Sequence, residues 1–460
     1  METWLGDETL FYRLQQLKQG LLQFTDTTNA YRLLAKHGNS IRYNAVWKKW
    51  LVWQDTHWAI DDGYLIHDLG LKIVRDFYEE LLKTADYRKR IDIEKHAMQS
   101  ESVRRRKALI EAASWIPELN VKSEELDNDP WLLNVKNGTI DLRSRELKEH
   151  SPQDLITRVA NVHYDKEADC PIWRRFLLEI MNYDMDLLNF LQSVAGWAIT
   201  GDTSEQMMFI MFGTGANGKS TFLNTIMNLM GEYAAATPTQ TFMKKTNDQT
   251  NDLARLRGTR LVTTTETEQG KRLSEPLIKQ ITGNDRITAR FLYGEYFSFV
   301  PTFKIFMATN HKPILKGTDH GIWRRIRLLP FTQRIPEDKQ DKRLEEKLRL
   351  EGPGILNWLL EGVEKWMEIG LVAPIAVKAA TEEYRAEMDV IGDFLKDRCV
   401  LTEGKAVKAR ELFRLYNEWC AENNERCCTE RYFGLRLKEM GISQKRTSQG
   451  RYWIGLTVQN

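Results

Sequence analysis

Residues 213–220, with the sequence GTGANGKS, constrain this chain most, because they match the pattern G-x-x-x-x-G-K-[ST] at every fixed position. The uninterrupted apolar run 207–212 precedes them, as expected of a strand buried on both faces of a parallel sheet. Apolar residues follow at helical spacing as far as Gly231, where a helix would stop. The sequence therefore predicts a strand, a phosphate-binding loop and a helix. A chance match in a glycine-rich turn is the alternative, and the flanking elements disfavour it.

The residue types of this loop suit a nucleoside triphosphate. Glycines let backbone N–H groups surround phosphates, and the start of the following helix adds a favourable dipole. Lys219 would reach the β- and γ-phosphates, and the Ser220 hydroxyl would ligate Mg²⁺, with Thr221 the next hydroxyl along. The predicted nucleotide-binding set is Gly213, Thr214, Gly215, Ala216, Asn217, Gly218, Lys219, Ser220 and Thr221.

Composition excludes several other classes of protein. The chain has 460 residues, enough for about three domains, and its 42% apolar content supports globular cores. Its 66 Lys and Arg residues nearly balance 64 Asp and Glu, so any nucleic-acid binding must be local. Five cysteines do not suggest a disulfide framework, and we find neither a membrane span nor a signal peptide. We expect a soluble, unexported protein in a reducing cytoplasm.

The pattern of elements predicts an α/β protein with three domains. Residues 1–160 predict a mixed α+β domain with helices, aromatic strands near residues 41–58 and a hairpin around Asn137-Gly138. A basic helical stretch in this domain favours solvated surface, with DNA contact as the alternative. Residues 161–375 predict the nucleotide-binding core, with further strands at 260–265, 303–309 and 326–329. Residues 376–460 predict three helices and a basic strand pair, which favours a winged-helix-like domain over a helical packing module.

Acidic and amide side chains follow two of the predicted strands. Glu266 and Glu268 end one strand at the sheet edge where α/β proteins bind ligands. One of them, Glu266 in our assignment, would hold Mg²⁺ and one would polarise the attacking water, although which does which is open. Asn310 ends the next strand and could orient that water, or could simply be a turn residue.

Two arginines, Arg324 and Arg325, precede the last predicted strand. One of them could neutralise transition-state charge on the nucleotide of a neighbouring subunit. The alternative is a surface ion pair. The predicted catalytic residues are Lys219, Glu266, Glu268, Asn310, Arg324 and Arg325.

This set of motifs resembles superfamily 3 helicases, which are AAA+ ring motors of viruses, phages and plasmids. It consists of GTGANGKS, the Glu266/Glu268 pair, residues 279–285, the run ATNHKP and the run WRRI. Upstream, DPWLLNVKNGTIDL, YDKEADCP and AGWAITGDTSE look like the domain before the motor in the phage/plasmid and poxvirus primase-helicase branch. The resemblance extends from about residue 26 to the C-terminus. It implies a hexameric, ATP- and Mg²⁺-dependent 3′-to-5′ DNA helicase for replication of a mobile element, in a bacterial cytoplasm.

Expected partners are single-stranded and forked DNA and a separate primase or polymerase, because the ~160 residues before the motor are too few for the primase domain of many relatives as well as the matched domain. In this family a hairpin before the third strand grips DNA. Here it would be residues 290–299 with Arg290, Tyr293 and Tyr296, which could equally be ordinary hairpin packing. Lys445 and Arg446 are the C-terminal candidates for DNA contact. An ATP-dependent initiator or loader that does not unwind DNA remains the alternative function.

Overall fold

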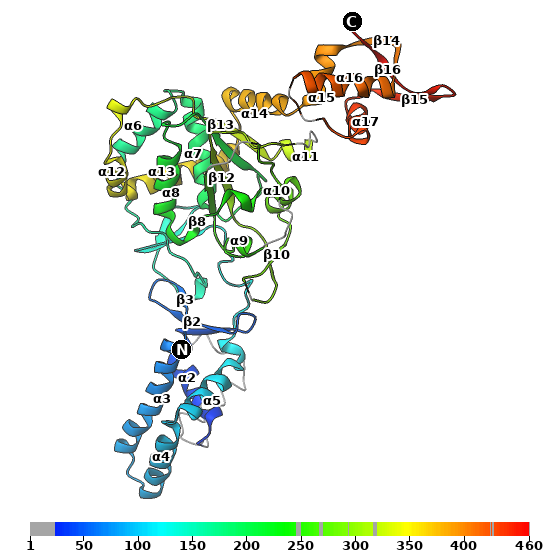
Figure 1. The fold of residues 1–460 in the computed structure, drawn as a ribbon. Helices are drawn as coiled ribbons and strands as arrows, with labels where there is room; N and C mark the ends of the chain where they lie inside the picture. The colour runs from blue at the N-terminus through cyan, green and yellow to red at the C-terminus, as the bar shows by residue number, and fades with distance from the viewer. Residues whose placement is uncertain are drawn as a thin grey trace.

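The structure is a computed structural model that describes residues 24–244, 250–265, 270–292, 294–315, 320–423, 425 and 427–459. Figure 1 shows an elongated molecule with a helical part at one end, an α/β part in the middle and a small C-terminal part at the other end. Within these residues, no helix combines the length and the apolar character needed to cross a bilayer.

The N-terminal part combines helices with small antiparallel sheets. The helices are α2 (Asp26–His37), α3 (Tyr64–Lys83), α4 (Tyr87–Ser100) and α5 (Val103–Ser114). One sheet holds β1 (Ile41–Asn44), β2 (Lys49–Trp53) and β3 (Trp58–Ile60), and the other holds β4 (Leu132–Val135), β5 (Gly138–Asp141) and β6 (Glu146–Lys148). Leu33, Phe77 and Ile110 belong to the core that the helices share. The boundary at residue 160 stays a prediction.

The hairpin predicted around Asn137 and Gly138 forms, but Gly138 lies in β5 opposite Val135 rather than in the turn. A Cβ atom at Gly138 would approach the carbonyl oxygen of Lys148 to 2.4 Å. The glycine is therefore required by the close passage of β6, a strand that the sequence analysis did not predict.

The central part is built on a parallel sheet in the order β13-β7-β12-β9-β8. These strands are β7 (Met208–Phe212), β8 (Ala234–Ala236), β9 (Leu261–Thr265), β12 (Lys304–Thr309) and β13 (Ile326–Pro330). All four neighbouring pairs are parallel, so the carboxyl ends of the strands meet at one edge. The predicted α/β class is confirmed. Strand β8 was missed because a run of alanines has low β propensity and forms a strand here only by pairing with β9.

Apolar side chains of β7 bury both faces of this sheet. Phe209 and Met211 join one core cluster, and Met208 and Ile210 join the other, so successive residues point to opposite faces. Helices cover both faces: α6 (Pro171–Ile180), α7 (Met185–Ile199), α8 (Lys219–Met230), α9 (Asn251–Ala254), α10 (Glu275–Thr282), α11 (His320–Trp323), α12 (Leu344–Leu350), α13 (Gly352–Ile369) and α14 (Ile375–Glu387). The short antiparallel pair β10 (Ile287–Ala289) and β11 (Phe297–Phe299) lies before β12.

The C-terminal part has three helices interleaved with an antiparallel sheet in the order β14-β16-β15. Its elements are α15 (Val390–Arg398), β14 (Cys399–Lys408), α16 (Ala409–Glu422), α17 (Glu430–Glu439), β15 (Ser443–Thr447) and β16 (Gly450–Val458). The predicted helices and the basic strand pair are present. Strand β14 was not predicted, because its charged middle hides the pattern and its pairing with β16 shifts register between Leu401 and Ala406.

Candidate functional site

The loop at residues 213–218 lies between β7 and α8, at the carboxyl edge of the sheet. A Cβ atom at Gly213 would lie 2.1 Å from Asn217 Nδ2 and 2.2 Å from the Phe331 carbonyl oxygen, so no larger residue fits there. Asn217 Nδ2 donates to that same carbonyl at 3.1 Å. The loop is therefore held against the segment that follows β13.

The Lys219 ammonium is buried under this loop, and its side chain belongs to a residue that is only 5% exposed. Nζ donates to the Gly213 carbonyl at 2.7 Å, to Asn217 Oδ1 at 2.9 Å and to Asn310 Oδ1 at 3.2 Å. These acceptors are neutral, so they do not offset the loss of hydration that a cation suffers on burial. Burial lowers the pKa of Lys219 from 10.5 to about 8. An anionic group placed here would favour the charged lysine.

Helix α8 begins beside this ammonium with a first turn that suits phosphate. Gly218 occupies the N-cap in a left-handed conformation, and within the described structure no side chain caps the helix start. Its first N–H groups and the positive end of the helix dipole thus face the loop. Ser220 is exposed in this turn and Thr221 is half-buried. A hydroxyl oxygen at Ser220 has the ligand chemistry that Mg²⁺ prefers.

Asn310 reaches the site through the pairing of β12 with β7. Thr309 lies opposite Phe212 in that ladder, so the residues that follow the two strands meet. The backbone then turns, with the His311 N–H donating to Thr309 Oγ1 at 3.0 Å. The structure thus brings two of the predicted catalytic residues, Lys219 and Asn310, into direct contact.

Glu266 and Glu268 lie outside the described residues, so their roles stay predictions. The strand before them, β9, ends at Thr265, which pairs with Ala308 of β12. The chain therefore leaves β9 at the same edge of the sheet as the loop and Asn310.

Arg324 and Arg325 lie at the opposite edge. The Met208 N–H donates to the Arg325 carbonyl at 2.8 Å, which places Arg325 at the amino end of β7. The length of β7, at ~3.3 Å per residue, separates that end from the loop by roughly 16 Å. Arg324 donates to Gln206 Oε1 at 2.9 Å, and Arg325 donates to Thr282 Oγ1 at 3.0 Å. These arginines therefore do not belong to the site formed by their own chain's loop.

The predicted strand pair at residues 290–299 differs from the structure. The strands are the short β10 and β11, and the segment from Arg290 to Tyr296 connects them. Aromatic alternation along this segment therefore does not reflect strand packing. The Arg290 guanidinium lies 4.7 Å from the Tyr296 ring centroid, and Tyr296 is 60% exposed. Tyr293 lies outside the described residues.

In the C-terminal part, Lys445 and Arg446 are exposed on β15 and pair in register with Tyr452 and Arg451 of β16. They form a basic strand pair, as predicted from the sequence.

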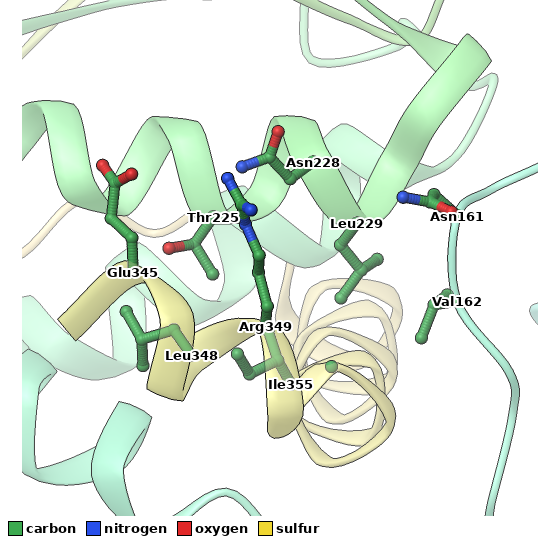
Figure 2. Close-up of a pocket in the computed structure, with 10 residues that line it drawn as sticks. Asn161, Val162, Thr225, Asn228, Leu229, Glu345, Leu348, Arg349 and Ile355 are labelled. Carbon is green, nitrogen blue, oxygen red and sulfur yellow. The ribbon is translucent and has the colours of Figure 1, made fainter. Parts of the chain in front are cut away.

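A cavity of about 390 Å³ lies at the far end of α8 from Lys219. Figure 2 shows Thr225, Asn228 and Leu229 of α8 on one side and Glu345 and Arg349 of α12 on the other. Because α8 begins at Lys219 and this cavity borders its second half, the cavity is separate from the loop site.

Sequence reasoning missed two features near these sites. The Ile335 N–H donates to the Ala216 carbonyl at 2.8 Å, so residues after β13 cover the loop. Trp47 lies under the Arg257 guanidinium, 4.4 Å from its carbon, and joins the N-terminal part to the central part. The sequence signal for the contact between Trp47 and Arg257 was an aromatic residue next to Lys48 and Lys49, within the stretch predicted as aromatic strands.

Family models match three stretches of the chain. The model described as "D5 N terminal like" matches residues 30–182, a family of unknown function matches 211–325, and "Poxvirus D5 protein-like" matches 386–453.

The curated relatives are viral proteins. "Putative helicase L207/L206" of Acanthamoeba polyphaga mimivirus is 27% identical over 323 residues, covering 65% of this chain and 34% of the relative. "Putative primase C962R" of African swine fever virus (isolate Tick/Malawi/Lil 20-1/1983) is 23% identical over 394 residues, covering 80% of this chain and 40% of the relative. "Putative helicase 022R" of Frog virus 3 is 27% identical over 295 residues, covering 58% of this chain and 30% of the relative. The chain thus spans about a third of the length of these relatives.

Among solved structures, the apo A form of the C-terminal region of NrS-1 is similar, with a TM-score of 0.51 at 10% identity, covering 93% of this chain and 99% of that one. At this identity the likeness concerns the fold alone. The family models and the named relatives together show a chain that is similar to viral proteins named as helicases and primases. Two of the models are of the D5 type, so the chain is similar to D5-type primase-helicases over residues 30–182 and 386–453.

Proposed function

We propose that this chain is the motor of an ATP-dependent DNA helicase, with an AAA+ core, that acts in replication of a virus or other mobile element. The observation that carries the proposal is the convergence of Lys219, Asn310 and the uncapped start of α8 at one edge of a parallel sheet. The similarity to D5-type proteins and to viral proteins named as helicases supports this class of reaction. The proposal includes unwinding in the 3′-to-5′ direction, assembly into a hexameric ring and action in a bacterial cytoplasm.

The site residues fit ATP with Mg²⁺, which when bound supplies a polarised γ-phosphate for attack by water. Lys219 would exchange its bonds to Gly213, Asn217 and Asn310 for bonds to phosphate oxygens. The Asn310 amide would then be released to hold the attacking water. Ser220 would ligate the metal, and one of Glu266 and Glu268 would accept the proton of the water.

Arg324 and Arg325 would act on the nucleotide of the adjacent subunit. Their position at the edge opposite the loop favours this, because about 16 Å of strand prevents contact within one chain. An arginine from a neighbour makes turnover depend on ring assembly.

DNA contact is proposed at Arg290, Tyr293 and Tyr296 and, separately, at the C-terminal basic strand pair. The order α15, β14, α16, α17, β15, β16 supports a winged-helix-like unit in which Lys445 and Arg446 lie on a strand of the wing. This second contact also favours the alternative function, an ATP-dependent loader that binds DNA without unwinding it.

Strand displacement on a forked DNA with a 3′ tail tests the proposal. Wild type is expected to separate the strands only with ATP and Mg²⁺. Lys219→Ala is expected to lose ATP hydrolysis and unwinding, while Lys342→Ala, a change at an exposed lysine, keeps both. Steady ATP hydrolysis without strand displacement from either polarity of tail would contradict the helicase and favour the loader.

A further inference from the structure

A cavity of about 1120 Å³ lies between the N-terminal sheet and the segment that connects β10 to β11. In Figure 1 it corresponds to the region where β2 and β3 approach the loops below the central sheet. It is larger than the ~300–1,000 Å³ typical of small-molecule pockets, and it is partly open to solvent.

A ladder of aromatic rings and one guanidinium forms the inner wall. The Arg257 guanidinium carbon lies 4.4 Å from the Trp47 ring centroid and 5.7 Å from that of Phe297. The Phe297 ring stacks on Phe291 with centroids 5.6 Å apart and an interplanar angle of 29°. Phe291 is 50% exposed, so part of its surface remains accessible. The ladder thus ends in aromatic surface open to a ligand.

The end of the turn between β1 and β2 and the start of β2 bring two lysines to this cavity, Lys48 and Lys49. Asn44 is fully buried, and its Nδ2 donates to the Val121 carbonyl at 3.0 Å. Its Oδ1 accepts from the Trp47 N–H at 3.0 Å, which fixes the turn. Lys48 and Lys49 follow, and both are exposed. Because the turn is anchored, the backbone that carries these cations has a fixed position beside the cavity.

Two of the acidic residues that line the cavity accept hydrogen bonds from backbone N–H groups. Asp127 accepts from the Thr157 N–H at 2.7 Å, and Glu232 accepts from the Val159 N–H at 2.9 Å. Glu124, Glu232 and Glu295 are exposed. The exposed cations of the lining are Lys48, Lys49, Arg255 and Arg286. The four exposed cations exceed the three exposed anions by one, and the half-buried Arg158 and Arg257 outnumber the half-buried Asp127, so the lining carries a net positive charge.

We propose that this cavity binds single-stranded nucleic acid, with phosphates on Lys48 and Lys49 and a base stacked on Phe291. Exposed aromatic faces combined with cations are the usual means of binding a single strand, whose bases are free to stack. A duplex would bring phosphates to the lysines but no base to Phe291. The N-terminal part would thus guide the strand toward or away from the central part.

This inference rests on the proposed function, because it extends the DNA path from Tyr296, which lines the cavity, toward Lys48 and Lys49 of the N-terminal part. The test measures binding of a fluorescein-labelled 20-nucleotide oligothymidylate by anisotropy, without ATP, between 50 and 200 mM NaCl. The lysine variant is Lys48→Ala with Lys49→Ala. Its matched control is Lys89→Ala with Arg90→Ala, which removes the same charge from exposed positions on α4 of the same part.

The lysine variant is expected to reduce the slope of log K against log salt by roughly 1.4, about 0.7 for each lost phosphate contact. Its affinity at 100 mM salt should fall roughly tenfold or more. Phe291→Ala is expected to weaken binding by roughly fivefold to a hundredfold while leaving that slope unchanged, because stacking releases no counterions. The control should match wild type in both affinity and slope.

Wild-type affinity and slope in the lysine variant, or no binding of the oligonucleotide by wild type, would overturn the proposal. The proposal would also be overturned if the lysine variant changed its oligomeric state, measured by sedimentation velocity, while each assembled particle bound the oligonucleotide as tightly as wild type. That result would make this face an interface between copies of the chain. Basal ATPase activity separates the two proposals. If wild type hydrolyses ATP but the lysine variant keeps the wild-type salt slope, only the cavity proposal is refuted. If the lysine variant changes the salt slope but wild type does not hydrolyse ATP, only the motor proposal is refuted.

Discussion

The Asn310 amide oxygen accepts a hydrogen bond from Lys219 Nζ at 3.2 Å, although 91 positions separate the two residues in the chain. The contact exists because β12 pairs with β7 in a register that ends both strands together. It couples the lysine that would neutralise phosphate charge to the amide that would hold water. Two substitutions at Asn310 distinguish its roles.

Asn310→Ala is expected to keep ATP binding and to lose most turnover, because the lysine retains its other acceptors while the water loses its partner. Asn310→Asp should instead weaken ATP binding, because a carboxylate beside Lys219 would compete with the phosphates. Binding of a fluorescent ATP analogue and steady-state hydrolysis measure the two effects. Equal behaviour of the two variants would contradict a direct role for the amide.

ATP affinity should depend on pH through Lys219. With a pKa of about 8 in the free protein, the lysine is largely charged at pH 7 and largely neutral at pH 9. Phosphate favours the charged form, so binding above pH 8 must take up a proton and affinity should fall about tenfold for each further pH unit. Isothermal titration calorimetry at pH 7 and pH 9, in buffers of different ionisation enthalpy, measures this uptake. Lys219→Ala should abolish the dependence.

The same shift affects the free energy of unfolding. The pKa of Lys219 is lower in the folded state than its usual 10.5, so between pH 8 and 10.5 the unfolded chain binds more protons. The contribution of this group to stability therefore rises with pH across that window. Below pH 8 its desolvation cost is fully present, so Lys219→Ala should not lower the melting temperature at pH 7. A large loss of thermal stability in that variant would contradict the burial effect.

Glu266→Gln and Glu268→Gln test the predicted acidic pair. One of them is expected to bind ATP normally and to slow hydrolysis on the order of 10²–10⁴-fold, the usual contribution of a general base. Single-turnover hydrolysis measures the effect, with Thr267→Ser as a neighbouring control. If neither substitution slows turnover, the hypothesis that these residues activate water is wrong.

Arg324→Ala or Arg325→Ala is expected to reduce turnover by about 10³–10⁵-fold while ATP still binds. Mixing the affected variant with Lys219→Ala should restore part of the activity, because some interfaces then join an intact loop to an intact arginine. Arg325→Ala should also lower the melting temperature, because Arg325 donates to Thr282 and to the Gly321 carbonyl. Mixed assemblies that never recover activity would contradict action between subunits.

Arg290→Ala combined with Tyr293→Ala and Tyr296→Ala should keep basal ATP hydrolysis and lose both DNA stimulation and strand displacement. Lys445→Ala with Arg446→Ala gives the contrast, since it should weaken duplex binding more than unwinding. Unwinding of forked DNA measures strand displacement, and fluorescence anisotropy of a labelled duplex measures duplex binding. Unwinding at the wild-type rate by the triple variant would contradict a channel grip at this segment.

The sequence by itself determined the local elements of this protein. The apolar run before Gly213, the glycines and Lys219 predicted a strand, a loop and a helix, and these form because each signal depends on residues close together in the chain. Strands ending at Thr265 and Thr309 were likewise predicted, within one residue of their observed starts. The basic strand pair at the C-terminus was predicted for the same reason.

Only the tertiary structure decided which of these elements meet. Strand order and register brought Asn310 to Lys219 and set Arg325 at the far edge, because parallel pairing joins strands distant in sequence. Strands β8 and β14 form through their neighbours, against weak local propensity. The stacking of Arg257 between Trp47 and Phe297 joins residues far apart in the chain. Local periodicity cannot encode that contact, because it depends on how the N-terminal sheet packs on the central part.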